Sequence, residues 1–122
     1  AMAVVLITHD LGVVADYADR IVVMYAGRVI ETLPTATLFT ASAHPYSQAL
    51  LASMPSTTGT TADLHTIRGA PPDPRHIGPG CAFAPRCDRA TRECHETLPP
   101  TVTVEPRHTS ACLHALDPVA HA

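Results

Sequence analysis

Four cysteines in the second half of the chain are the residues whose type most clearly suggests chemistry. Five, six and seventeen residues separate successive members of the set, which comprises Cys81, Cys87, Cys94 and Cys112. Four thiolates can ligate an iron–sulfur cluster or a zinc ion, and in an oxidising compartment four cysteines can form two disulfides. The spacing lacks the paired Cys-x2-4-Cys knuckles of zinc ribbons and matches no ferredoxin pattern. Spacing alone therefore leaves an iron–sulfur site, a zinc site, two disulfides and unligated cysteines as alternatives.

A histidine near the start of the chain is the second candidate. His9 follows the apolar run Val4–Ile7 and precedes Asp10, which can cap a helix. Such a run is typical of a central strand in a parallel sheet, buried on both faces. Polar residues just beyond such a strand lie where α/β proteins bind their ligands. The competing interpretation is an ordinary surface histidine at the end of a strand.

Periodicity predicts the elements that would position these residues. Residues 3–31 are predicted to form a strand, a helix with apolar residues three and four apart, and two strands at 21–24 and 29–31 around a turn at Gly27. Residues 35–39 suggest a short helix. A second helix is expected from Pro45 to Ala52, because proline suits the first helical position. Residues 56–62 have the composition of a polar linker.

The last part of the chain differs in composition from the rest. Residues 63–122 contain all four cysteines, many prolines and histidines, and little apolar periodicity. We expect loops and short elements gathered around a central site rather than a conventional core. The four cysteines are therefore predicted to converge on one place, with His95, His108 and His114 as substitute ligands or, preferably, solvent-facing residues. Arg86 and Arg92 could offset the charge of such a site or be surface residues, and Phe83 is expected to pack over it.

Composition limits the possible functions. Aromatic residues make up only 4% of the chain, so its core must be modest. A net charge of −3 disfavours a nucleic-acid partner, and the absence of lysine excludes a catalytic lysine in these residues. No apolar run is long enough to span a membrane, and no signal peptide is visible.

The sequence resembles two parts of one protein family. The switch-histidine region of ATP-binding cassette (ABC) ATPases is similar to ITHDL at 7–11, ADYADR at 15–20 and VMYAGR at 23–28. The C-terminal extension of the oligopeptide and dipeptide importer ATPases resembles HPY at 44–46, IRGAPP at 67–72, GCAFAPRC at 80–87 and the cysteines that follow. Together these segments cover nearly the whole chain. Leu33 departs from the family, which usually has glycine after the hairpin.

The resemblance implies a fold and a division of the chain. The fold class is α/β: the C-terminal part of a RecA-like ABC ATPase core, made of strand, helix and hairpin, followed by a small irregular cysteine-rich extension. Residues 1–33 would belong to the nucleotide-binding domain, 34–62 to a helical connector and linker, and 63–122 to the extension. The family's phosphate loop, signature motif and catalytic glutamate would lie upstream, so this chain alone is expected to be inactive.

The resemblance also implies a function. The parent subunit would hydrolyse ATP with Mg²⁺ beside a second, homologous or identical ATPase subunit, and would drive peptide uptake through membrane permease subunits at the cytoplasmic face of the bacterial inner membrane. It would contact peptide only indirectly and would not bind nucleic acid. His9 would contact the γ-phosphate as a catalytic residue. The four cysteines would hold a [4Fe–4S] cluster, with zinc as the alternative. The competing function is a stand-alone metal- or iron–sulfur-binding interaction module without ATPase activity.

Overall fold

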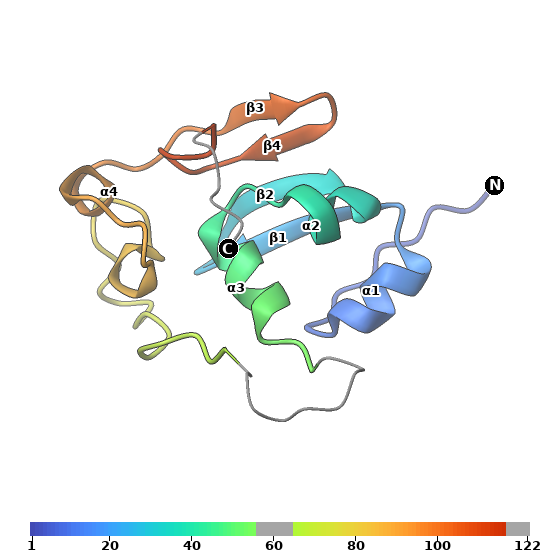
Figure 1. Ribbon diagram of the computed structural model, residues 1–122, viewed down its shortest axis with the longest axis horizontal. Helices are drawn as coiled ribbons and strands as arrows, with labels where there is room; N and C mark the ends of the chain where they lie inside the picture. Colours follow the sequence, from blue (N-terminus) through green and yellow to red (C-terminus); the bar gives the residue numbers. More distant parts are fainter. Residues whose placement is uncertain (56–64, 117–122) are drawn as a thin grey trace.

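The computed structural model describes residues 1–55 and 65–116, and Figure 1 shows their arrangement. The elements in chain order are α1 (Leu11–Tyr17), β1 (Arg20–Tyr25), β2 (Arg28–Pro34), α2 (Thr35–Ala41), α3 (Pro45–Ala52), the 3-10 helix η1 (Ala84–Arg86), α4 (Arg92–Glu96), β3 (Val102–Glu105) and β4 (His108–Ser110). The two predicted connector helices are confirmed as α2 and α3. The predicted linker at 56–62 lies outside the described residues.

One antiparallel sheet joins the two ends of the described chain. Its strand order is β1-β2-β4-β3, and each neighbouring pair is antiparallel. Strand β4 pairs with β2 through Glu31 opposite Ser110 and Thr32 opposite Thr109. The cysteine-rich tail therefore extends the sheet that the N-terminal hairpin begins (Figure 1). The structure is a small α/β fold, and its described strands are antiparallel rather than parallel as the first strand had suggested.

The β1–β2 hairpin follows the prediction closely. Ala26 and Gly27 form its two-residue turn, and both have positive φ angles, +48° and +76°. Turns of this kind match the right-handed twist of the flanking strands. Leu33 does not lie in a turn: it is fully buried in β2 opposite Ile21. The side chain at this position therefore fills the core of the sheet.

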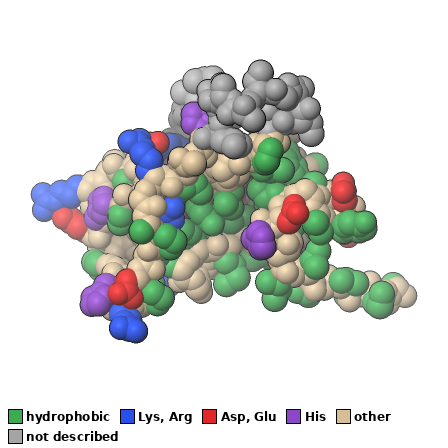
Figure 2. Space-filling model, turned by 90° about the horizontal axis from the view of Figure 1, so that it is seen from below, with side chains coloured by type: hydrophobic (Ala, Val, Ile, Leu, Met, Phe, Trp, Pro, Cys, Tyr) green, Lys and Arg blue, Asp and Glu red, His purple; other side chains and the backbone are tan. Residues whose placement is uncertain are grey.

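The prediction of a buried first strand is wrong for this structure. Residues 4–7 are exposed, Ile7 by 94%, and they form no strand. A strand buried on both faces needs neighbours for its N–H and C=O groups, and residues 1–55 and 65–116 supply none to this segment. The segment therefore protrudes beside α1 with its apolar side chains uncovered (Figures 1 and 2). The predicted helix cap is confirmed, because the Asp10 carboxylate accepts the N–H groups of Gly12 and Val13.

The core links the hairpin, α3 and the cysteine-rich segment. Tyr25 of β1, Tyr46 of α3 and Phe83 form a group of three aromatic rings, with centroids 4.6 to 5.3 Å apart. Rings at such separations and tilts attract one another beyond their area of burial. Leu33 and Leu38 belong to the same buried cluster. Three segments distant in the sequence are therefore held around one apolar centre.

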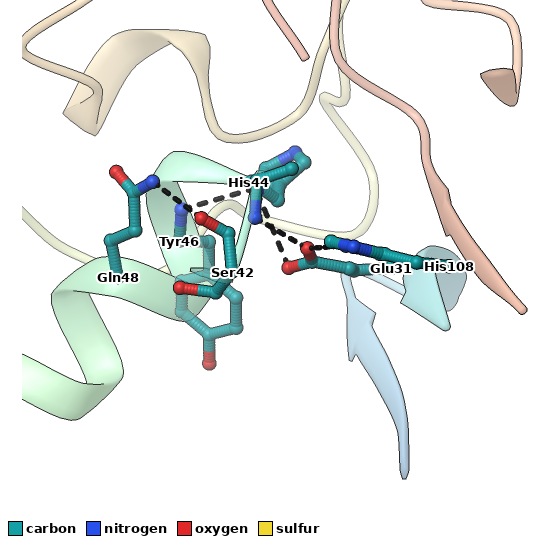
Figure 3. A network of polar contacts seen from close by, with 7 residues as sticks. Glu31, Ser42, His44, Tyr46, Gln48 and His108 are labelled. Carbon is teal, nitrogen blue, oxygen red and sulfur yellow. Dashed lines mark hydrogen bonds and ion pairs between the residues drawn. The ribbon is translucent and has the colours of Figure 1, made fainter. Parts of the chain in front are cut away.

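A buried carboxylate ties the same segments together (Figure 3). Glu31 of β2 accepts the backbone N–H groups of Ala43 and His44 at 2.6 and 3.3 Å. It also accepts Nε2–H of His108 from β4 at 2.7 Å, and both side chains of this pair are buried. A buried carboxylate is tolerated only when donors replace its water. Glu31 therefore fixes the loop before α3 and strand β4 against the hairpin.

Replacing Glu31 by alanine is expected to lower the free energy of unfolding by about 3 to 5 kcal/mol, because it leaves three buried donors without an acceptor. Urea unfolding followed by circular dichroism measures this loss. The matched control is Glu96→Ala, which breaks the exposed Arg92–Glu96 pair and should cost less than about 0.5 kcal/mol. Equal losses in the two variants would contradict the role given to Glu31.

Candidate functional site

The four cysteines converge as predicted. All of them are free thiols, and all line one cavity of about 20 Å³. Phe83, Ala84 and Pro99 are among the apolar residues of its wall, so the prediction that Phe83 packs over the site is confirmed. Cys112 lies with the other three despite the seventeen residues that separate it from Cys94. The alternative of two disulfides in this volume is not what the structure contains.

Local backbone contacts bring the sulfur atoms together. The N–H of Cys81 donates to the carbonyl of Cys94 at 2.8 Å, which joins the segment before η1 to α4. The N–H of Cys87 donates to the carbonyl of Ala84 and closes the turn of η1. Cys112 follows β4, where the N–H of Ala111 donates to Ile30 of β2 at 2.8 Å. Pairing in the sheet therefore places Cys112 beside the other three cysteines, which lie close together in the sequence.

The chemistry of the donor set suits a soft metal centre, but the present geometry does not form one. Four thiols around one cavity are the donors that zinc and iron–sulfur clusters require. Within residues 1–55 and 65–116, however, no group of three or more histidine, cysteine, aspartate or glutamate side chains is placed to hold a metal ion. The cavity has room for about one water molecule. Binding a metal would require the thiol side chains to rearrange, and metal ligation by these cysteines stays a prediction.

The thiols differ in how readily they ionise. Burial raises the pKa of Cys81, Cys87 and Cys112 above the ordinary value for a thiol. Burial acts in the same direction on Cys94, but hydrogen bonds from Thr91 and His114 outweigh it, and the pKa of Cys94 is lowered. The Thr91 hydroxyl lies 3.4 Å and Nε2 of His114 lies 3.5 Å from this sulfur. Cys94 is therefore the first thiolate that the site would offer to a metal.

Two of the three flanking histidines differ from the solvent-facing residues that we preferred. His114 contacts Cys94 through its ring, and its backbone N–H donates to the Cys112 sulfur at 3.4 Å. His108 is buried on Glu31, and so it is neither exposed nor a substitute ligand. Only His95 is exposed as expected.

A different arginine from the two we expected acts electrostatically on the cysteines. Arg86 donates to the carbonyls of Ile67 and Arg68 and to the Tyr25 hydroxyl, so it is a structural residue. Arg92 pairs with Glu96 on the surface. The charge of Arg89 favours ionisation of Cys87 and Cys112, and one of its buried terminal nitrogens has no hydrogen-bond partner within the described part of the chain. Arg89 thus supplies positive charge that acts on Cys87 and Cys112, which sequence reasoning missed.

His44 is the second residue that sequence reasoning missed. The sequence placed it in the His-Pro-Tyr motif without any chemistry, yet it also lines the cysteine cavity and is only 1% exposed. Its Nδ1 accepts the N–H of Tyr46 at 3.0 Å and so caps α3. Burial lowers the pKa of His44 to about 4, although the Glu31 carboxylate acts in the opposite direction. The ring is therefore neutral near pH 7.

His9 lies far from this centre. It immediately precedes Asp10 and α1, with its side chain exposed. In Figure 1, α1 and α4 lie at opposite ends of the molecule, so His9 and the cysteines form two separate candidate sites. No helix in the described ranges is both long and apolar enough to cross a bilayer.

The family described as the oligopeptide/dipeptide transporter, C-terminal region, matches residues 30–94, more than half of the chain. The chain belongs to this family.

Individual relatives extend the match toward both ends. The oligopeptide transport ATP-binding protein AppD of Bacillus subtilis is 43% identical over 110 residues, which are 90% of this chain and 34% of AppD. A protein of Brucella ovis named as a putative peptide import ATP-binding protein is 43% identical over 118 residues, 92% of this chain and 35% of its own length. The chain therefore spans about a third of the length of the curated relatives it matches.

The approach of Cys81 to Cys94 depends on Gly80. A Cβ atom at this position would lie 2.3 Å from the carbonyl oxygen of Cys94 and 2.5 Å from the backbone of His95. Gly80→Ala is expected to push these segments apart and to cost about 1 to 3 kcal/mol of unfolding free energy. Gly78→Ala is the matched control, because nothing lies within 4 Å of its added Cβ. Urea unfolding of both variants checks this, and equal stabilities would show that the close approach does not constrain the site.

The lowered pKa of His44 predicts a pH-dependent stability. Between the ordinary histidine pKa of 6.5 and the folded value of about 4, the unfolded chain binds one more proton than the folded chain. The His44 contribution is fully present above pH 6.5 and is lost as the pH falls toward 4, a change of about 3 kcal/mol. The variant His44→Asn keeps an acceptor for the helix cap. Between pH 7 and 4, its unfolding free energy in urea should fall less steeply with pH than that of the wild type, by the contribution of about one proton. An unchanged slope would be the contrary result.

Proposed function

We propose that the chain is the C-terminal part of the ATP-hydrolysing subunit of a bacterial ABC importer for peptides. The observation that carries this proposal is a sequence match over about nine-tenths of the chain. The matched relatives are named for peptide import or transport and for ATP binding, and the match covers about a third of the length of each. The whole subunit binds ATP and Mg²⁺ beside a second ATPase subunit. It drives uptake through membrane permease subunits at the cytoplasmic face of the inner membrane, and it touches peptide only indirectly.

Within this proposal, His9 contacts the γ-phosphate. Its exposure in front of α1 supports the role, because the ring is open to a nucleotide bound by other parts of the subunit. Asp10 is engaged in capping α1, which argues against its acting as the catalytic base. The 122 residues contain no lysine, so the lysine of a phosphate loop has to come from elsewhere in the subunit. The chain alone is accordingly expected to have no ATPase activity.

The proposed division of labour follows the chain. Residues 1–33 complete the nucleotide-binding domain, residues 34–62 connect, and residues 63–122 form the cysteine-rich extension. The way β4 of the extension pairs with β2 of the hairpin supports a rigid attachment of the extension to the domain.

The extension is proposed to hold a [4Fe–4S] cluster, with zinc as the alternative. Support comes from the four free thiols on one cavity and from the lowered pKa of Cys94. A bound cluster would supply a cross-link between the segments and a one-electron redox couple. Cys81, Cys87, Cys94 and Cys112 would ligate it, Phe83 would exclude water, and Arg89 would offset its negative charge.

The catalytic part of the proposal is tested in the full-length subunit with its permease in lipid vesicles. His9→Ala should lower kcat for ATP hydrolysis about 100-fold or more with a small change in KM, because the contact strengthens as the γ-phosphate leaves. The control is His76→Ala, an exposed histidine paired with Asp73. A raised KM with unchanged kcat would place His9 in ground-state binding and not in catalysis.

Metal analysis tests the cysteine centre. Chain purified without oxygen should contain about four iron and four acid-labile sulfide per molecule, since each of the four thiolates ligates one iron of the cluster. One zinc per molecule without sulfide would select the alternative. Neither metal at stoichiometric levels would contradict a metal centre in this extension.

A further inference from the structure

The imidazole of His44 has one nitrogen already engaged. Nδ1 accepts the backbone N–H of Tyr46 at 3.0 Å. A ring nitrogen that accepts a hydrogen bond carries no proton, so the proton of the ring must be on Nε2. The helix cap thereby sets the tautomer, and His44 presents an N–H donor on its other side.

That second nitrogen is buried without a partner. Nε2 of His44 has no hydrogen bond within the part of the chain that the structure describes, and the side chain is almost fully buried. A buried donor left without an acceptor destabilises the folded protein. Figure 3 shows the ring turned away from the Glu31 carboxylate, which contacts only the backbone of this residue. An acceptor is therefore expected elsewhere, on the far side of the ring.

The cysteine cavity adjoins His44, although no cysteine sulfur of the described structure lies within hydrogen-bond distance of Nε2. His44 lines the same small cavity as all four cysteines. Neutral thiols accept hydrogen bonds weakly, whereas ionised sulfur accepts them well and, in a partly buried site, needs them. Donors of this kind around a metal centre commonly orient the ligands and strengthen binding.

We propose that His44 donates a hydrogen bond from Nε2 to the ionised sulfur of the cysteine site and positions that site for a metal ion or cluster. This inference rests on the cysteine centre of the proposed function. It makes the His-Pro-Tyr segment bifunctional: one nitrogen of His44 starts α3, and the other stabilises the sulfur site. The residue is a positioning residue and not a ligand, because its remaining nitrogen carries a proton.

The test separates the two nitrogens. His44→Asn keeps a side-chain oxygen for the helix cap and removes the donor to the cavity. The full 122-residue chain, reduced and metal-free, is titrated with Zn²⁺ against a chelator. We expect His44→Asn to weaken zinc binding about 10- to 100-fold, while the metal-free melting temperature stays close to that of the wild type. His95→Asn is the matched control: an exposed histidine beside Cys94 undergoes the same change and should bind zinc normally.

A second measurement needs no variant. In chain labelled with ¹⁵N-histidine, the His44 shifts should identify the Nε2–H tautomer, and that resonance should move when one equivalent of Zn²⁺ is added. A proton on Nδ1, an unmoved resonance, or an unchanged zinc affinity in His44→Asn would each overturn the role of His44 alone. Failure of the wild-type chain to bind zinc or iron would overturn the cysteine centre itself, and the role of His44 with it.

Discussion

The buried carboxylate of Glu31 is the contact on which the rest of this structure depends. It lies in β2, the central partner of the hairpin, and accepts donors from the loop before α3 and from β4. Removing a carboxylate from water is costly, and the cost is offset only while all of its donors stay in place. Packing of a few apolar side chains could tolerate small shifts, but these hydrogen bonds cannot. Glu31 therefore fixes the positions of the hairpin, the loop before α3 and strand β4 relative to one another, which a core this small would not do alone.

The geometry of the cysteine site depends on the contacts of Glu31. On one side, β4 is held against β2, and Cys112 follows it directly. On the other side, the loop held by Glu31 leads into α3. Tyr46 of this helix packs on Phe83, which lies between Cys81 and Cys87 in the sequence. Both routes end at one cavity, although the residues concerned are far apart in the sequence. A metal bound there would link the cysteine segments to one another in addition to the contacts made through the sheet. Its binding free energy would add to the stability of the extension.

Features set by neighbouring residues could be predicted from the sequence. Asp10 caps α1, Gly27 turns the hairpin and Pro45 starts α3, because each depends on backbone preferences within a few residues. Convergence of the cysteines also followed from composition, since the tail has too few apolar residues to form a core of its own. These predictions needed no knowledge of the partner segments.

Features that depend on distant partners could not be predicted. His108 looked like a surface residue because its partner, Glu31, lies 77 residues away. Arg86 and Arg92 stand as close to the cysteines in sequence as Arg89, and only the folded backbone decides which arginine acts electrostatically on Cys87 and Cys112. The apolar run at 4–7 predicts a buried strand, but burial of a strand requires neighbours that the described residues do not provide. Sequence patterns predict local helices and turns, but they do not predict which distant residues a side chain contacts.

A double-mutant cycle between Glu31 and His108 tests the central claim most directly. Glu31→Gln, His108→Gln and the double variant are compared with the wild-type 122-residue chain by urea unfolding at pH 7. If the pair holds the tail to the hairpin, the coupling free energy should be about 1 to 3 kcal/mol, as for residues in one buried hydrogen-bond network. A coupling near zero, with the two single effects simply adding, would mean that the tail is held by other contacts and would contradict the account.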